Sequence, residues 1–83
     1  MTWLVKISIN LKKGVLDAQG AATKNALASL GYKEVKEVRV GKCINIIIEG
    51  GKPEIVNQKV EEMCKKLLAN PVIEDFTYEI EVL

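Results

Sequence analysis

Hydrophobic and polar residues alternate strictly in two segments of the chain, residues 3–11 and residues 76–82. A period of two is typical of a β-strand that buries one face and leaves the other in water. The apolar positions are Trp3, Val5, Ile7, Ile9 and Leu11 in the first segment and Phe76, Tyr78, Ile80 and Val82 in the second. Each segment therefore predicts a strand with one buried face.

Residues 18–30 have the spacing of a helix, with small and apolar side chains at Ala22, Ala26, Leu27 and Leu30. Asp17 precedes this segment and is expected to accept a hydrogen bond from a free amide of the first turn. Gly31 follows it, where a left-handed residue commonly ends a helix. The alanines favour a helix that packs closely on a sheet. Gly20 lies inside the first turn, where we expect it to let another backbone approach, such as that of another subunit.

A second helix is predicted from Pro53, because proline suits the first helical position. Its apolar stripe consists of Val56, Val60, Met63, Cys64 and Leu67. The pairs Glu61–Lys65 and Glu62–Lys66 place an acid four residues before a base, which supports the helix by about 0.2–0.5 kcal/mol each. Asn70-Pro71 is expected to end it.

Residues 34–40 and 43–49 predict two further strands, joined as a hairpin at Gly41-Lys42. Val35 and Ile47 would then place apolar groups on the solvent side of the sheet. Such groups indicate that part of this second face is covered, which another chain could do.

The predicted order is β-α-β-β-α-β, which makes residues 1–83 a single α+β domain. The expected architecture is a two-layer sandwich, in which two helices cover one face of a four-stranded antiparallel sheet. The pattern leaves open whether this sheet closes within one chain or extends across a dimer. An 83-residue chain has a thin core, so we expect a homo-oligomer, a dimer or higher.

Charge and cysteine content exclude several classes of partner. The net charge is +1, from 12 basic and 11 acidic residues without a basic stripe, which argues against nucleic-acid binding. The longest apolar run, Ile46–Ile48, is far shorter than a membrane span, and no signal peptide is recognisable before the first strand. Cys43 and Cys64, without any histidine, are too few for structural zinc. We expect no metal site, and two buried, reduced thiols in a cytoplasmic protein.

The sequence predicts no catalytic residue and no cofactor-binding residue. Without histidine the usual general base is missing. Cys43 has no neighbour that would activate it, and Glu79 and Glu81 on the polar face of a strand are expected to be solvated. Residues 14–20 could cradle a phosphate at a helix start, but they lack the known phosphate-loop spacings, and a tight turn or a subunit contact fits them better.

Two motifs are similar to those of a known family. Residues 13–20 read KGVLDAQG and residues 38–42 read VRVGK. Together, at this distance, they resemble the signature of the PurS family of small subunits of phosphoribosylformylglycinamidine synthase, and the likeness covers nearly the whole chain. The motif positions are Gly14, Asp17, Gly20, Arg39, Gly41 and Lys42, and the resemblance implies that these residues shape the turns used in subunit assembly.

The resemblance implies a subunit in purine biosynthesis that has no activity alone. Such subunits dimerise and bridge a glutaminase subunit and a synthetase subunit, and they support ammonia transfer. This chain would bind no cofactor itself, whereas the synthetase partner would use ATP and Mg. The alternative is a regulatory module that binds a small molecule, of the ACT-like βαββαβ order. An enzyme resembling acylphosphatase would need a glycine-rich phosphate loop that is absent.

Overall fold

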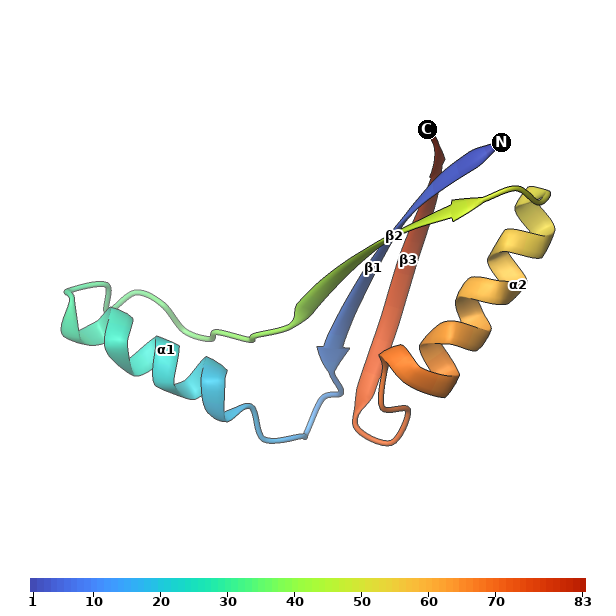
Figure 1. Cartoon of the computed structure of the whole chain (residues 1–83). Coiled ribbons are helices and arrows are strands. Elements are labelled where there is room, and N and C mark those ends of the chain that lie inside the picture. Colours follow the sequence, from blue (N-terminus) through green and yellow to red (C-terminus); the bar gives the residue numbers. More distant parts are fainter.

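The computed structural model describes residues 1–83 and contains one three-stranded antiparallel sheet with the strand order β2-β1-β3 (Figure 1). The elements in chain order are β1 (Thr2–Leu11), α1 (Ala18–Ser29), β2 (Lys42–Glu49), α2 (Pro53–Met63), a π-helical turn η1 (Cys64–Leu68) and β3 (Glu74–Val82). The α+β class and the two helices are as predicted. A four-stranded sheet within one chain is wrong, because the sheet has three strands.

The strand register brings the predicted apolar faces together on one side of the sheet. On the central strand β1, Ile7 lies between Ile44 of β2 and Tyr78 of β3, and Val5 lies between Ile46 and Ile80. The alternation found in the sequence therefore continues across all three strands. The opposite face carries an ion pair between Lys6 Nζ and Glu81 Oε1 at 2.9 Å and other polar residues, but also Leu4 opposite Ile47.

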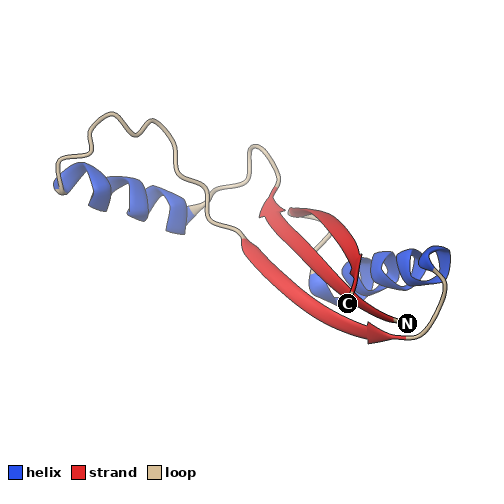
Figure 2. Ribbon diagram, turned by 90° about the horizontal axis from the view of Figure 1, so that it is seen from above, coloured by secondary structure: helices blue, strands red, loops and turns tan.

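The helix α2 covers the apolar side of the sheet, as the ribbon view from above shows (Figure 2). Its residues Val56 and Val60 are buried together with Cys64 against the central strand. The buried core consists of Trp3, Val5, Ile7, Ile9, Val56, Val60, Cys64 and Ala69. Every large buried side chain thus comes from β1 or from the α2–η1 segment.

The end of the second helix differs from its prediction at Leu67, which is 81% exposed. The α2 helix continues into η1, where the Ala69 amide donates to the Cys64 carbonyl five residues earlier. A π-helical turn holds more residues than an α-helical turn, so it rotates the following positions around the axis. Leu68 and Ala69 consequently face the sheet in place of Leu67.

The helix α1 does not lie over the sheet, so the predicted two helices on one face are also wrong for the single chain. Figure 1 shows α1 on an extension that projects away from the strands, and the molecule measures 49 × 28 × 14 Å. We call residues 13–40 the arm and the rest of the chain the body. The local helix prediction holds, since Asp17 Oδ1 accepts a hydrogen bond from the Gly20 amide and Gly31 has a φ of +102°.

Residues 34–40 do not form the predicted strand. They return from α1 to the sheet without strand pairing, and β2 pairs with β1 instead of with this segment. The alternation of Val38 and Val40 fits a strand, but a strand also needs a neighbour, and the arm carries this segment away from the sheet edge. The predicted hairpin at Gly41-Lys42 is therefore wrong.

The two cysteines differ in exposure, and both are free thiols. Cys64 is buried as predicted, and burial, with the nearby Glu61 carboxylate, raises the pKa of its thiol. Cys43 is exposed, contrary to prediction, because it pairs with Ser8 on the polar face of the sheet. None of the helices has the length and apolar character needed to span a membrane.

The position of the core predicts which isoleucines support the body. Ile7→Ala should lower the free energy of unfolding by about 2–5 kcal/mol, because Ile7 is fully buried and a cavity would remain. The matched control, Ile47→Ala, removes the same atoms from a side chain that is 66% exposed. This control should change the free energy of unfolding by about 0.5 kcal/mol or less. Urea unfolding followed by Trp3 fluorescence measures both. Equal effects would contradict this description of the core.

Candidate assembly site

The two sequence motifs meet in space at the base of the arm, where the chain leaves β1 and returns to β2. We call this crossing the neck and define it as residues 11–20 and 38–42. All six predicted site residues lie in it: Gly14, Asp17, Gly20, Arg39, Gly41 and Lys42. The structure gives each of them a contact or a conformation in the neck, whereas their part in subunit assembly stays a prediction.

Asp17 holds the two segments of the neck together. One carboxylate oxygen, Oδ1, accepts from the Gly20 amide at 2.9 Å, and the other, Oδ2, accepts from the Val40 amide at 2.8 Å. These two amides, and more weakly the Arg39 guanidinium, lower the pKa of the Asp17 carboxyl below its ordinary value of 3.8. A lowered pKa stabilises the folded state above that ordinary value, and the stabilisation is lost as the pH falls through the folded pKa. At neutral pH the carboxylate is therefore ionised and both bonds form.

Two glycines allow the backbones to cross closely. A Cβ atom placed on Gly20 would lie 2.2 Å from the Val38 carbonyl oxygen, and one on Gly41 would lie 2.7 Å from the Ile9 carbonyl oxygen. The close approach expected at Gly20 is thus present, but the approaching backbone belongs to the same chain. Gly14 serves differently, because its φ of +85° makes the turn that leads out of β1.

Arg39 and Lys42 tie the returning segment to the body. Arg39 Nη2 donates to the carbonyls of Leu11 at 3.0 Å and Lys12 at 3.3 Å. Lys42 Nζ lies 3.8 Å from Glu74 Oε2, while Glu74 Oε1 accepts from the Asn70 amide at 2.8 Å. The resemblance implied that both residues shape turns used in subunit assembly, and the structure shows that they make contacts within the chain.

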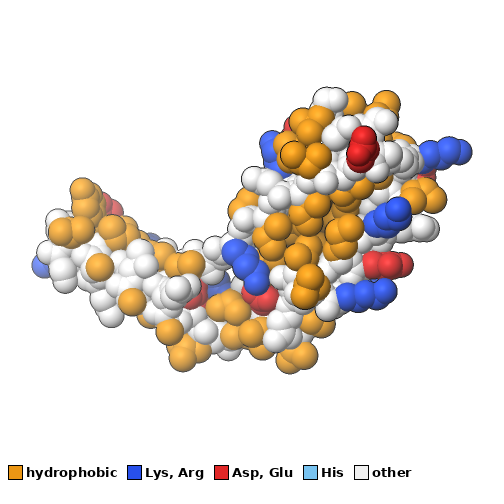
Figure 3. All heavy atoms as spheres, viewed as in Figure 1, with side chains coloured by type: hydrophobic (Ala, Val, Ile, Leu, Met, Phe, Trp, Pro, Cys, Tyr) orange, Lys and Arg blue, Asp and Glu red, His pale blue; other side chains and the backbone are white.

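The arm and the body each expose apolar surface. Leu30 and Tyr32 at the far end of α1 are 73% and 53% exposed, and Gly20 is the one buried residue of the helix. On the body, a hollow of about 450 Å³ lies beside α2, and we call it the groove. Ile46, Met63, Leu67 and Leu68 line it, with Lys59, Glu62 and Lys66 at its rim. In Figure 3, hydrophobic side chains gather over the body beside the helix and along the arm.

The groove was not predicted from the sequence. Ile46 and Met63 were assigned to buried stripes, and two helices were expected to cover the sheet, within one chain or across a dimer. The small size of the core could have indicated such a groove, because one helix does not cover the whole apolar face of a three-stranded sheet. What the sequence could not give is the direction of the arm.

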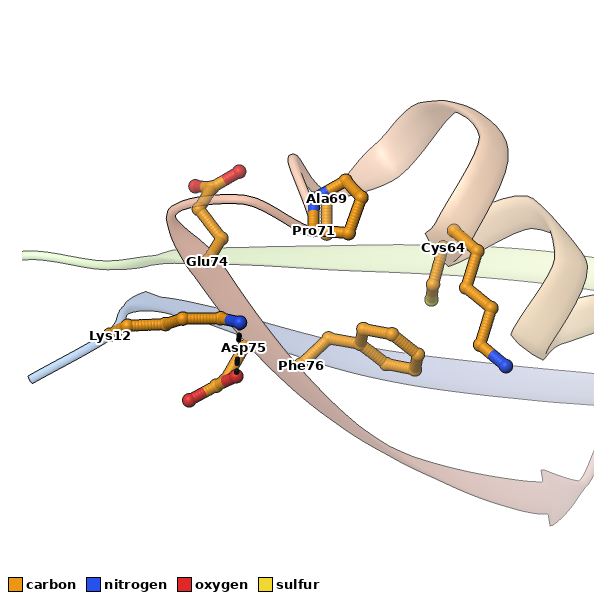
Figure 4. Close-up of a pocket in the computed structure, with 8 residues that line it drawn as sticks. Lys12, Cys64, Ala69, Pro71, Glu74, Asp75 and Phe76 are labelled. Atoms are coloured by element: carbon orange, nitrogen blue, oxygen red, sulfur yellow. Dashed lines mark ion pairs between the residues drawn. The ribbon is translucent and has the colours of Figure 1, made fainter.

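A larger hollow of about 520 Å³ lies under the end of η1, close to the neck (Figure 4). Figure 4 shows Phe76 in its floor, with Lys12 and Asp75 facing each other, and their charged atoms are 4.0 Å apart. Lys65 lies 3.9 Å from Glu61, and Glu74 faces Lys42. Each charged residue of this hollow already has a partner within the chain, so the hollow offers little to recognise a ligand.

The start of α1 is also a poor phosphate site. A hollow of about 460 Å³ there is lined by Lys24, Lys36 and Arg39, but also by Asp17 and Glu37. The ionised Asp17 carboxylate already occupies the position at the helix start that an anion would take. Nor does any group of three His, Cys, Asp or Glu side chains come together in a way that could hold a metal ion.

Comparison with known proteins identifies the family. The family model described as PurS, phosphoribosylformylglycinamidine (FGAM) synthase, matches residues 4–82. The PurS subunit of phosphoribosylformylglycinamidine synthase from Methanocaldococcus jannaschii is 53% identical over 75 residues, which cover 90% of each chain. The chain belongs to the PurS family.

Solved structures of this family have the same fold. The PurS structure from Bacillus subtilis is 46% identical, with a TM-score of 0.85 and coverage of 96% of this chain and 99% of that one. A chain in the structure of PurLQS from Thermotoga maritima is 26% identical, with a TM-score of 0.88 and coverage of 98% and 99%. Because these scores extend over the arm as well as the body, the arm is part of the common fold.

The crossing at the neck predicts a local effect of a methyl group. Gly20→Ala should push the Val38 carbonyl away and weaken the bond between Asp17 and the Val40 amide, so that this amide exchanges its hydrogen about tenfold faster. Gly14→Ala is the control, because a Cβ atom there meets nothing within 4 Å and only its positive φ is strained. Amide exchange followed by NMR measures both. An unchanged Val40 amide in Gly20→Ala would show that the close approach does not hold the neck.

Proposed function

We propose that this chain is the non-catalytic assembly subunit of a phosphoribosylformylglycinamidine synthase, which joins the glutaminase and synthetase subunits and supports the transfer of ammonia between them. The observation that carries the proposal is membership of the PurS family together with the likeness to a chain of the PurLQS structure. The structure is consistent with it, because its distinctive features are exposed apolar surfaces and not a cluster of reactive groups.

The chain forms a homodimer in which the arm of each copy covers the groove of the other. The arm exposes the apolar side chains of Leu16, Leu30 and Tyr32, and the groove exposes an apolar lining, so packing of the arm into the groove would remove apolar surface of both from water. Residues 34–40 of the second copy would then lie near the β2 edge, as a fourth strand. The predicted two helices over four strands would form across two chains instead of within one.

The two edges of the sheet support pairing at β2. Residues 43–48 of β2 contain no charged side chain, whereas β3 carries Asp75, Glu79 and Glu81 on its exposed positions. Charges along an edge strand oppose the addition of another strand, and an uncharged edge permits it. Extension of the sheet is therefore directed to β2 and away from β3.

The remaining chemistry belongs to the partner subunits. In this proposal the synthetase uses ATP and Mg, the glutaminase releases ammonia, and this chain binds no cofactor and works with them in the cytoplasm. The regulatory ACT-like alternative is not favoured, because the family model and the solved structures all point to the synthase.

Reconstitution tests the assembly role directly. The purified chain alone should convert no formylglycinamide ribonucleotide, because it contains no histidine and its carboxylates and thiols do not gather in groups of three or more. Added to the glutaminase and synthetase subunits with ATP and Mg, it should produce glutamine-dependent amidine formation. Turnover by the chain alone, or a glutamine-dependent activity of the other two subunits that the chain does not increase, would contradict the proposal.

A charge in the groove tests the dimer. Leu67→Glu should leave the single chain folded, since Leu67 is 81% exposed, but raise the dimer dissociation constant at least about 100-fold by burying an unpaired carboxylate. Val72→Glu is the control, because Val72 is 79% exposed in the turn before β3 and lies outside the groove. Sedimentation equilibrium measures both dissociation constants. Equal values for the two variants would place the interface elsewhere.

A further inference from the structure

The neck joins the arm to the body through hydrogen bonds from two directions. Asp17, in the outgoing segment, accepts from the Val40 amide in the returning segment. Arg39, in the returning segment, donates to the Leu11 and Lys12 carbonyls where the outgoing segment begins. We call these two contacts the latch. These contacts connect the first and the last residues of the arm, so the latch fixes the direction of α1 relative to the sheet.

With the latch formed, α1 points away from α2, beside which the groove of the same chain lies (Figure 1). The arm is nevertheless built from elements that could cover that groove, because the element order is the one expected for a closed sandwich of two helices over one sheet. Without a restraint, closure of a chain on itself would compete with exchange between two chains.

Closure within one chain is favoured over association of two chains by the effective concentration of the arm. An arm tethered by a short flexible linker has an effective concentration near its own groove on the order of millimolar, whereas another copy at micromolar concentration is about a thousandfold more dilute. A flexible arm would therefore cover its own groove first. Association of two copies needs a restraint that makes self-closure unfavourable, and the latch is such a restraint.

We propose that the latch, formed by the backbone contacts of Asp17 and of Arg39, holds the arm away from its own groove. The groove is then available to the arm of a second copy. This inference rests on the dimer proposed above and adds the residues that select it over a closed monomer. Asp17 and Arg39 act as positioning residues, since they act through the direction of α1 and not through contact with the other copy.

Asp17→Ser separates the latch from the capping of α1. Serine caps helices as well as aspartate does, so its single oxygen can accept from the Gly20 amide. It has no second carboxylate oxygen to reach Val40, so one half of the latch is lost. Arg39→Ala removes the other half and leaves the cap intact. Asp75→Ser is the matched control, because it makes the same change on an exposed residue whose one ion pair, with Lys12, is 4.0 Å long.

Sedimentation velocity over a range of concentrations gives both the dimer dissociation constant and the shape of the monomer. We expect Asp17→Ser and Arg39→Ala each to raise the dissociation constant about 10- to 100-fold, as fits the loss of hydrogen bonds to a charged group. Their monomers should be more compact than the 49 Å extended chain. Asp75→Ser should behave as the unmodified chain. Trp3 fluorescence and far-ultraviolet circular dichroism confirm that the body and α1 are folded.

The outcomes separate this inference from the proposed dimer. Unchanged dissociation constants in both variants would overturn the latch while the dimer stands. Monomers that keep the extended shape would also overturn it, since the arm would then be loose but not closed. An unmodified chain that stays monomeric at all concentrations would overturn the dimer and the latch together. If Asp17→Ser does not fold, Arg39→Ala alone decides, because it leaves the cap of α1 in place.

Discussion

The relation between the arm and the body depends on one carboxylate that bonds both segments of the neck. The chain leaves the sheet at Leu11 and returns at Lys42, the beginning of a neighbouring antiparallel strand, so the whole arm starts and ends at the same end of the sheet. The arm would have no fixed direction relative to the sheet unless contacts held its first and last residues together. The Asp17 carboxylate supplies fixation because its two oxygens accept from amides on opposite segments, and Gly20 removes the side chain that would keep those segments apart.

The extended shape explains why so little of the chain is buried. Nine of 83 residues are buried, and the core is one face of β1 covered by α2 and η1. A domain of this length depends on nearly all its apolar stripes to offset the loss of chain entropy on folding. Here Leu27 of α1 and the isoleucines Ile44, Ile46 and Ile48 of β2 are only partly buried within the single chain. Burying them further would need a second chain, so the proposed association would also add stability.

The elements whose pattern is local were predictable from the sequence. The alternation in β1 and β3 gave both strands and the apolar face of each, although Val82 at the end of β3 is exposed, and Asp17, Gly31 and Pro53 marked helix ends correctly. The largest errors concern the position of α1 and the segment 34–40. Residues 34–40 alternate like a strand but have no neighbour in the chain, because alternation describes two faces and carries no information about pairing partners.

The candidate site was predictable as a set of residues but not as a mechanism. The two motifs indicated six positions, and the structure brings all six to the neck. Their partners could not be foreseen, because Gly20 and Arg39 contact backbone atoms that lie 18 or more residues away in the sequence. The exposure of Leu67 could not be predicted for a similar reason. The π-helical turn that exposes this residue follows from packing and not from a regular spacing of apolar residues.

The surfaces that remain polar limit how far association can go. The β3 edge carries Asp75, Glu79 and Glu81, so it does not favour a second copy, whereas the face of the sheet opposite α2 carries both the Lys6–Glu81 pair and the exposed side chain of Ile47. The groove and the β2 edge are different, since one is apolar and the other uncharged. If both sheet edges could pair with another chain, copies would add to each other without end. With one edge able to pair and one groove that fits one arm, two copies can form a closed dimer in which no such surface is left over. In the proposed pair the polar surfaces would stay exposed to water.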